Sequence, residues 1–247
     1  MRVDAGLRAA VPPAELPSAE RLLTAPLREL PPGPGALETL FDDVVHPFGA
    51  LLLRGVVTSN VAIAGRRSAH LLGPGDVLRP WRSADTTVPC ASSWTAAGGA
   101  EVAVLDDRFL MGMRRWPRVG AVIFERLAEQ VEAGAVRTAI VALPRVEQRV
   151  LAMFWQLADR WGVVRPDGVV IRLALTHELI GWLTGAQRPT VSLALHTLAD
   201  QGLLRRDETG AWILGSDSRA ELAVQPAPRF GPASIVCARP VAQTARR

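Results

Sequence analysis

The chain has 247 residues, of which 49% are hydrophobic and 21% charged, and this composition is typical of a globular protein. Its two cysteines, Cys90 and Cys237, exclude a disulfide scaffold, a four-cysteine zinc site and a four-cysteine iron–sulfur cluster. The net charge of +4 belongs wholly to residues 144–247, which hold 13 Arg and 9 acidic residues, because residues 1–143 hold 15 of each. A neutral part joined to a basic part favours a sensing or scaffolding domain attached to a polyanion-binding one.

The chain shows no sign of a membrane protein or of a secreted one. No apolar run approaches the roughly 18 residues that a membrane span needs, and acids and prolines interrupt the N-terminal segment where a secretory signal would be apolar. Together with the low cysteine content, this predicts a soluble protein of a reducing cytoplasm, with no membrane partner.

The first 115 residues predict a domain rich in β-strands. A short helix is expected around Ser18–Leu23, followed by a proline- and glycine-rich loop at residues 31–35. From Phe48 to Leu105, glycine turns separate short apolar stretches, and such spacing is typical of an antiparallel sandwich or barrel. The apolar stretches are Ala50–Leu53, Val56–Val57, Val61–Ile63 and Val102–Leu105, and the turns lie at Gly55, Gly65, Gly73–Asp76 and Gly98-Gly99.

A long helix is predicted over residues 118–143, with Pro117 in its first turn and Pro144 ending it. Apolar residues recur at helical spacing: Val119, Val122, Ile123, Leu127, Val131, Val136, Ala139, Ile140 and Leu143. Such a helix would be about 39 Å long at 1.5 Å per residue. Its one-sided pattern favours pairing with a copy of itself as a coiled coil. The alternative is a helix that packs only on its own domain.

The next segment predicts two short helices joined by a glycine turn. It follows a helix over Arg145–Trp161, stopped by Gly162, and a strand at residues 169–173. Thr176 can cap the first short helix, and Gly185 permits the positive φ of a sharp turn. The second begins near Gln187 and directs Val191, Leu195 and Leu198 inward, so that the pair forms a helix-turn-helix.

The outward side chains of this second helix suit DNA. N-terminal residues of such a helix reach base edges in the major groove, where Arg pairs with guanine and Gln with adenine, while Thr, Ser and His suit phosphate oxygens. Two short strands with a basic pair follow at residues 203–214 and predict a wing. The DNA-binding candidates are Thr176, His177, Gln187, Arg188, Pro189, Thr190, Ser192, His196, Arg205 and Arg206. The alternative is an ordinary helical pair inside a core, with Arg188 merely solvated.

The series Arg188-Pro189-Thr190-Val191-Ser192, with Leu195, Leu198 and Gly202-Leu203-Leu204, resembles the recognition-helix signature of the Crp/Fnr family of bacterial transcription regulators. The resemblance extends upstream, to a β-roll like that family's cyclic-nucleotide-binding domain and to the long helix. It implies an α+β fold: an N-terminal antiparallel, jelly-roll-like β-roll (1–115), a dimerisation helix (116–143), a C-terminal winged helix-turn-helix (144–215) and an extended or partly disordered tail (216–247). It also implies a homodimer on two-fold symmetric double-stranded DNA, RNA polymerase as a partner and a small-molecule effector.

The chain departs from this family at the cyclic-nucleotide motif. Pro80 stands where the family's ribose-binding Glu would be, and the Arg-Ser pair that holds the phosphate falls near Cys90-Ala91. A buried phosphate without fixed donors is costly, so we expect no cyclic AMP binding of the usual kind. Arg79, Arg82 and Ser92 are candidates for a different anion, or else solvated loop residues. Pro189 and Leu193 replace the family's acidic base-reader and later Arg, so its best-known operators are not expected.

Two alternatives stay open. The first is a cupin-like small-molecule-binding β-barrel enzyme with a helical appendage, whose metal would need clustered His and acidic ligands. The chain has four His and no His-x-His, and it shows no Ser/His/Asp arrangement, P-loop or dinucleotide fingerprint. We therefore expect no catalytic residue, metal or cofactor. The second alternative is a regulator whose β-roll serves only as a dimer scaffold and binds no effector.

Overall fold

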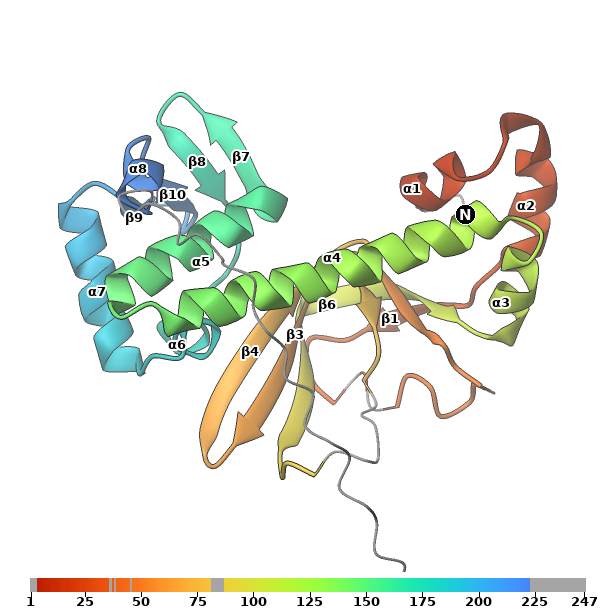
Figure 1. The fold of residues 1–247 in the computed structure, drawn as a ribbon, viewed down its shortest axis with the longest axis horizontal. Helices are drawn as coiled ribbons and strands as arrows, with labels where there is room; N and C mark the ends of the chain where they lie inside the picture. Colours follow the sequence, from red (N-terminus) through yellow and green to blue (C-terminus); the bar gives the residue numbers. More distant parts are fainter. Residues whose placement is uncertain (1–3, 36, 38, 45, 81–86, 223–247) are drawn as a thin grey trace, which may run out of the picture.

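The computed structural model describes residues 4–35, 37, 39–44, 46–80 and 87–222, and it shows two β-containing domains joined by one long helix, α4 (Figure 1). The N-terminal elements are α1 (Ala5–Ala9), η1 (Pro13–Glu15), α2 (Leu16–Leu22), β1 (Leu27–Leu30), β2 (Gly33–Pro34), β3 (Gly49–Ile63), β4 (Arg66–Leu72), β5 (Val77–Leu78), β6 (Ala91–Leu105) and α3 (Asp107–Met113). After α4 (Pro117–Ala142) follow α5 (Val146–Trp161), β7 (Gly162–Arg165), β8 (Gly168–Ile171), α6 (His177–Thr184), α7 (Arg188–Asp200), β9 (Leu204–Arg206), β10 (Trp212–Leu214) and α8 (Ser218–Leu222).

The N-terminal domain is an antiparallel sheet with apolar side chains on both faces. In the described residues its strand order is β1-β6-β3-β4, with β2 paired to β6 and β5 paired to β3. Because side chains alternate along a strand, Ala50 and Leu52 of β3 enter one core, while Leu51 faces a second core built with α1, α3 and α4. The mixed α+β architecture predicted from the sequence is confirmed.

The strands of this domain are longer than the sequence predicted. The apolar stretches between residues 50 and 63 belong to one strand, β3, and the pair Gly98-Gly99 lies inside β6 rather than at a turn. Gly55, Gly98 and Gly99 have φ of 91°, 78° and 87°, and the β3–β6 register shifts beside Gly55. These glycines are therefore bulges, which bend a strand without ending it. The turns predicted at Gly55 and Gly98-Gly99 were wrong, whereas those at Gly65 and Gly73–Asp76 are confirmed.

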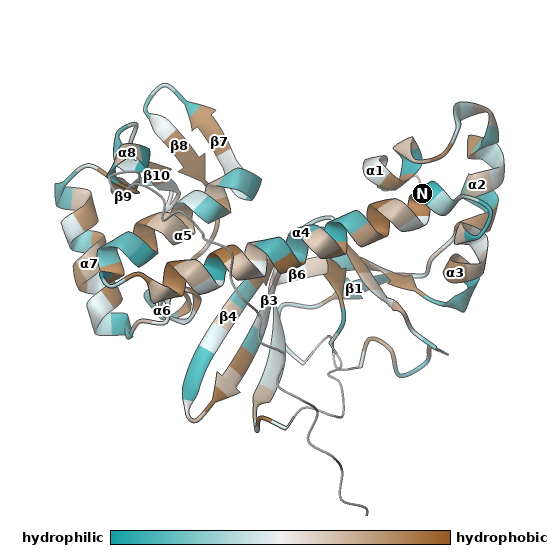
Figure 2. Ribbon diagram, in the orientation of Figure 1, coloured by the Kyte–Doolittle hydropathy of each residue, from teal (hydrophilic) through white to brown (hydrophobic). Residues whose placement is uncertain are grey.

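Helix α4 divides its apolar residues between two faces. Val119, Ile123 and Ile140 are buried against the protein's own cores. Phe124 and Val131, seven residues apart, keep 71% and 73% of their surface exposed. The sequence predicted one apolar stripe on this helix, whereas the structure has a buried stripe and an exposed stripe. Figure 2 shows the hydrophobic stretches of α4 in brown. Within the described ranges, no helix combines the length and apolarity needed to cross a membrane.

The C-terminal domain packs α5, α6 and α7 on one core beside an antiparallel sheet of order β7-β8-β10-β9 in the part of the chain described. Helix α5 ends at Gly162, as predicted, and Gly162 has a φ of −78° and continues directly into β7. A Cβ there would lie 2.4 Å from the carbonyl oxygen of Ala158, and this close approach explains the glycine. Within the segment predicted to be extended, Ser218–Leu222 forms α8; residues 223–247 lie outside the described residues.

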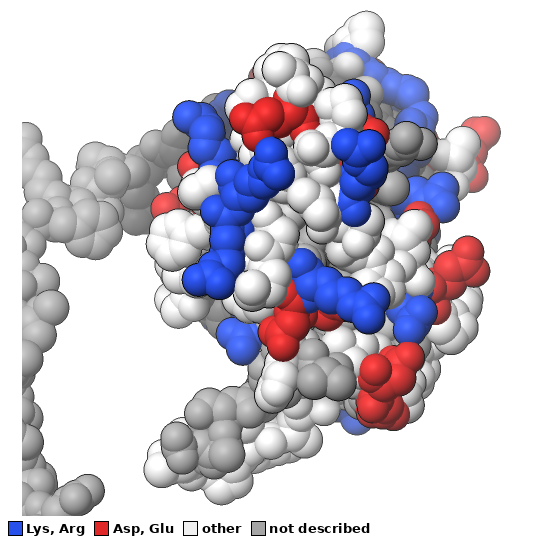
Figure 3. Space-filling model, turned by 90° about the vertical axis from the view of Figure 1, so that its right-hand side faces the viewer, with Lys and Arg blue, Asp and Glu red and all other residues white. Residues whose placement is uncertain are grey.

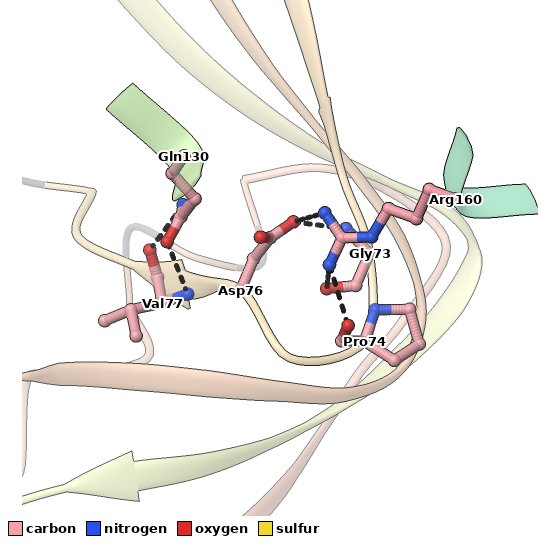
Figure 4. A network of polar contacts seen from close by, with 6 residues as sticks. All are labelled: Gly73, Pro74, Asp76, Val77, Gln130 and Arg160. Atoms are coloured by element: carbon pink, nitrogen blue, oxygen red, sulfur yellow. Dashed lines mark hydrogen bonds and ion pairs between the residues drawn. The ribbon is translucent and has the colours of Figure 1, made fainter. Parts of the chain in front are cut away.

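The two domains meet along β4 and the turn that follows it. Ala69 and Leu71 of β4 are buried in the core of the C-terminal domain. Arg160 of α5 reaches the turn, where its guanidinium donates to the Asp76 carboxylate at 2.5 Å and to the Pro74 carbonyl at 2.7 Å (Figure 4). The Asp76 carboxylate also accepts from the Gly73 amide at 2.7 Å. Arg160 therefore connects the C-terminal domain to the N-terminal domain.

Candidate nucleic-acid interface

The first helix of the predicted motif, α6, begins and ends as the sequence indicated. The Thr176 hydroxyl accepts from the Leu179 amide at 3.1 Å, which confirms the N-cap. Gly185 ends the helix in the left-handed conformation, with φ of 67°. Gly181, which we did not single out from the sequence, allows a close approach, because a Cβ there would lie 2.6 Å from the Ala186 carbonyl oxygen. These features set the angle between α6 and α7.

The second helix, α7, buries one side and exposes the other. Val191, Leu195 and Leu198 are buried, as predicted, in the core shared with α5 and α6. Gln187 is the N-cap residue, but its side chain makes no capping hydrogen bond, and Pro189 occupies the first turn. The helix therefore presents a free polar N-terminus, where backbone amides and the helix dipole favour anions.

The four residues Gln187–Thr190 are all exposed at this N-terminus. No carboxylate among the described residues pairs with the guanidinium of Arg188, and no described acceptor bonds to it. This exposure is expected of a helix that reads DNA, and equally of an ordinary helical pair in which Arg188 is only solvated. An unpaired guanidinium beside a free helix N-terminus can bind a base edge or a phosphate.

His177 and Ser192 lie together, but they bond to each other. The His177 Nδ1 and the Ser192 Oγ are 2.8 Å apart, and the Ser192 hydroxyl donates to the Arg188 carbonyl at 3.1 Å. Since a hydroxyl has one proton to donate, His177 Nδ1–H is the donor to Ser192. This chain of bonds links the start of α6 to the first turn of α7 and leaves the other ring nitrogen, Nε2, for an outside partner.

Two further residues extend the exposed side of α7. His196 is exposed and lies 3.5 Å from the Asp200 carboxylate. Leu193, four residues after Pro189, keeps 65% of its surface exposed. Sequence reasoning noted Leu193 only as a departure from a family pattern; its position one turn beyond Pro189 on the outward side was the available signal.

The wing places its arginines far from the N-terminus of α7. β9 follows α7 after three residues, so Arg205 and Arg206 lie near the C-terminal end of that helix, on the order of 20 Å from Arg188 at 1.5 Å per residue (Figure 1). Arg205 pairs with Asp167 at 3.3 Å, and Arg206 donates to the Gly210 carbonyl at 3.0 Å. Both are exposed, and both already have partners in their own domain.

The wing turn is organised by Asp207, a residue that the sequence analysis did not select. Its carboxylate accepts from the Thr209 hydroxyl at 2.7 Å and from the amides of Thr209 and Ala211, each at 2.9 Å. The hydrogen bond from the Thr209 hydroxyl is the main cause that lowers the pKa of Asp207. The turn therefore keeps its shape while the two arginines flank it.

The structure does not bring two of the effector candidates, Arg79 and Ser92, together. Arg79 follows Leu78, which pairs with Ala50 near the start of β3, whereas Ser92 pairs with Val61 near its end. Arg82 lies outside the described residues. In the parts of the chain that are described, no three His, Cys, Asp or Glu side chains gather as metal ligands do.

Charges elsewhere are interleaved rather than of one sign. The end of the molecule that carries α1, α2 and α3 presents arginines among acidic side chains (Figure 3). Arg28 pairs with Asp43 at 2.9 Å, and Arg126 pairs with Asp4 at 2.8 Å. This end is therefore a weaker candidate for a polyanion than the unpaired N-terminus of α7.

Comparison with known proteins agrees with this geometry. Residues 148–217, from α5 to the end of the wing, match the family described as the Crp-like helix-turn-helix domain. The C-terminal part of the chain is thus a Crp-like helix-turn-helix domain, and the chain is similar to regulators of the Crp/Fnr family. It is 27% identical over 170 residues, covering 66% of this chain and 75% of the relative, to a protein of Mycobacterium tuberculosis named CRP-like cAMP-activated global transcriptional regulator.

Solved structures with low sequence identity share the fold of this chain. The cyclic nucleotide-binding domain containing protein of Listeria monocytogenes is 14% identical with a TM-score of 0.63, covering 89% of this chain and 99% of that chain. A CooA mutant from Carboxydothermus hydrogenoformans is 17% identical with a TM-score of 0.62, covering 81% and 88%. The β-roll and the winged helix-turn-helix of this chain thus have the fold of these structures.

Proposed function

We propose that this protein is a dimeric, sequence-specific DNA-binding transcription regulator of the Crp/Fnr type, located in the cytoplasm. The observation that carries the proposal is the exposed, unpaired N-terminus of α7, at Gln187–Thr190, held in place by the His177–Ser192–Arg188 hydrogen bonds. In a helix-turn-helix this is the part that reads base edges. Arg188 binds guanine, Leu193 contacts a thymine methyl group, and Thr176, Thr190 and His196 contact the backbone.

The dimer forms through the exposed face of α4. Ala121, Phe124, Ala128, Val131 and Ala135 recur at spacings of three and four, which is the pattern of a two-stranded coiled coil. We call this set the α4 stripe. Its apolar members would otherwise remain in water. Two copies joined there place two α7 helices on successive half-sites, about 34 Å apart, and RNA polymerase is a further partner of such a regulator.

The effector is a small molecule, and it is not cyclic AMP held by the family's usual ribose and phosphate contacts. Pro80 provides no carboxylate for a ribose, and Arg79 and Ser92 are separated along β3. A cavity of about 590 Å³, lined by His70, Asp76 and Arg137 among others, lies between β4, α4 and α5 and offers room for a ligand. We expect no rise in melting temperature with cyclic AMP in a thermal-shift assay, because a ligand stabilises only the state that binds it. Stabilisation at micromolar cyclic AMP would contradict this.

Footprinting on the gene's own upstream region tests the DNA-binding proposal. We expect a pseudo-palindromic site whose affinity falls with salt. Arg188→Ala is expected to cost about 1–3 kcal/mol and to relax specificity at one base pair per half-site. Arg165→Ala, at an exposed arginine on the β7–β8 hairpin, serves as the control and is expected to bind as the parent does. Equal binding by parent and Arg188→Ala would show that α7 does not read the bases.

The alternative of a cupin-like enzyme receives no support. The matched domain is a helix-turn-helix and the named relatives are transcriptional regulators. Stoichiometric iron, manganese or zinc in the purified protein would be the finding that favours the enzyme.

A further inference from the structure

The β3–β4 hairpin of the β-roll places two arginines beside the C-terminal domain. Its turn, Ala64-Gly65, has positive φ at both residues, 49° and 74°, and Ile63 pairs directly with Arg66. Two positive φ values are the signature of a tight two-residue hairpin turn. Arg66 and Arg67 therefore begin β4 at the very end of a rigid hairpin, and both are exposed.

This hairpin is attached to the helix-turn-helix. The Arg67 guanidinium lies 5.3 Å from the centre of the Trp182 ring of α6, within the range of a cation–π contact. Figure 1 shows the hairpin standing next to α6. The Arg67–Trp182 contact thus fixes the position of Arg66 and Arg67 relative to the helix-turn-helix.

The hairpin and the N-terminus of α7 border one hollow. It measures about 770 Å³ and is lined by Arg66 and Arg67 on one side and by Gln187 and Arg188 on the other. Against three arginines, Glu178 is the one acidic residue in its described lining. No carboxylate of the described residues pairs with any of the three arginines. The hollow is therefore complementary in charge to phosphate groups.

Duplex DNA fits this arrangement better than it fits the rest of the surface. When α7 enters the major groove, which is about 12 Å wide, the phosphates that border the groove lie one groove width or less from Arg188. Arg66 and Arg67 line the same hollow as Arg188, so they lie about as far from Arg188 as the phosphates at the edge of the groove do. Guanidinium groups without a carboxylate partner at such a border bind phosphate oxygens without reading sequence.

We propose that Arg66 and Arg67 bind DNA backbone phosphates, so that the β-roll itself contacts the duplex next to the groove that α7 enters. The inference rests on the proposed DNA-binding function and adds a second domain to the interface. The contact couples the two domains: any movement of the hairpin relative to α6 changes the number of phosphates that the protein holds.

The test compares DNA affinity and its salt dependence in the full-length parent and in the double variant Arg66→Ala/Arg67→Ala. We expect affinity for the operator and for an unrelated duplex to fall by about the same factor, roughly tenfold, because phosphate contacts carry no sequence information. The slope of log K against log salt is expected to shrink by up to about 2. Arg66→Ala alone removes no contact to Trp182, and we expect it to lower the affinity roughly threefold and the slope by up to about 1.

The control is Arg54→Ala, at an exposed arginine of β3 outside the hollow, and we expect it to keep the parent's affinity and slope. Unchanged binding by the double variant and by Arg66→Ala would overturn the inference while leaving the proposed function in place. Tighter binding by either variant would also overturn it, because the hairpin would then obstruct DNA. A parent protein that binds no duplex even at low salt would overturn the proposed function itself, and the inference with it.

Discussion

At the scale of single residues, the interactions predicted from the sequence are those between near neighbours. Thr176 bonds to an amide three residues away, and Pro117 and Gly185 act through their own φ angles. The bond between Arg160 and Asp76 joins residues 84 positions apart. Nothing local marks Arg160 as different from the other arginines, because its role depends on where the β-roll lies.

Removing Arg160 tests the connection between the domains. Arg160→Ala leaves a buried Asp76 carboxylate without its cation and removes the donor to two turn carbonyls. Burial is the main cause that raises the pKa of Asp76, and Arg160 opposes it, so the variant's carboxylate is more costly to ionise. Since Arg160 is partly exposed, we expect a loss of about 1–3 kcal/mol of unfolding free energy, measured by urea denaturation.

The matched control is Arg165→Ala, for which we expect a change within about 0.5 kcal/mol. A double-mutant cycle with Asp76→Asn measures the interaction energy between the two side chains, because their effects on the free energy of unfolding add only if the side chains do not interact. Strict additivity would show that the Arg160–Asp76 contact contributes nothing to stability.

At the scale of elements, helices were predicted more closely than strands. The helix predicted from 118 to 143 runs from Pro117 to Ala142, because prolines bound it and its apolar period is helical. β3 and β6 were divided into pieces, because Gly55 and Gly98 have the positive φ of turns although both strands continue past them. A glycine that makes a bulge and a glycine that makes a turn look alike in sequence; the partner strand decides between them.

The exposed side of α4 gives a prediction for this scale. Val131→Glu places a charge in the centre of the α4 stripe, where two copies would have to bury it. We expect the variant to shift from dimer to monomer in sedimentation at micromolar concentration, with the affinity for a two-fold operator reduced at least tenfold as the second half-site is lost.

Val164→Glu provides the control, because this valine is at least as exposed (83% against 73%) but lies on the β7–β8 hairpin. It is expected to sediment as the parent does. A parent that is monomeric, or a Val131→Glu variant that remains dimeric, would show that α4 packs only on its own domain.

At the scale of the whole molecule, the placement of the two domains was the least predictable feature. β4 pairs within the β-roll, yet its Ala69 and Leu71 are buried with Val150 and Phe154 of α5. A seven-residue strand that serves two cores carries no clear periodic mark of doing so, because its apolar residues are only Ala69 and Leu71 on one face and Leu72 on the other. The domains therefore share one stretch of backbone, and stability measured in one must depend on the other.

His70, on that shared strand, gives the last prediction. Burial, together with the charges of Arg137 and Arg160, lowers the pKa of His70 from 6.5 to about 4. The folded protein therefore holds a neutral imidazole, while the unfolded chain takes up a proton below pH 6.5. The resulting stabilisation is complete above pH 6.5 and disappears as pH falls toward 4, by on the order of 2–3 kcal/mol in total. His70→Gln, which cannot titrate, is expected to lose less stability than the parent across this window when both are unfolded in urea at a series of pH values. Carboxylates titrate alike in both proteins, so the difference isolates His70, and parallel curves would show that its ring is not held neutral by the fold.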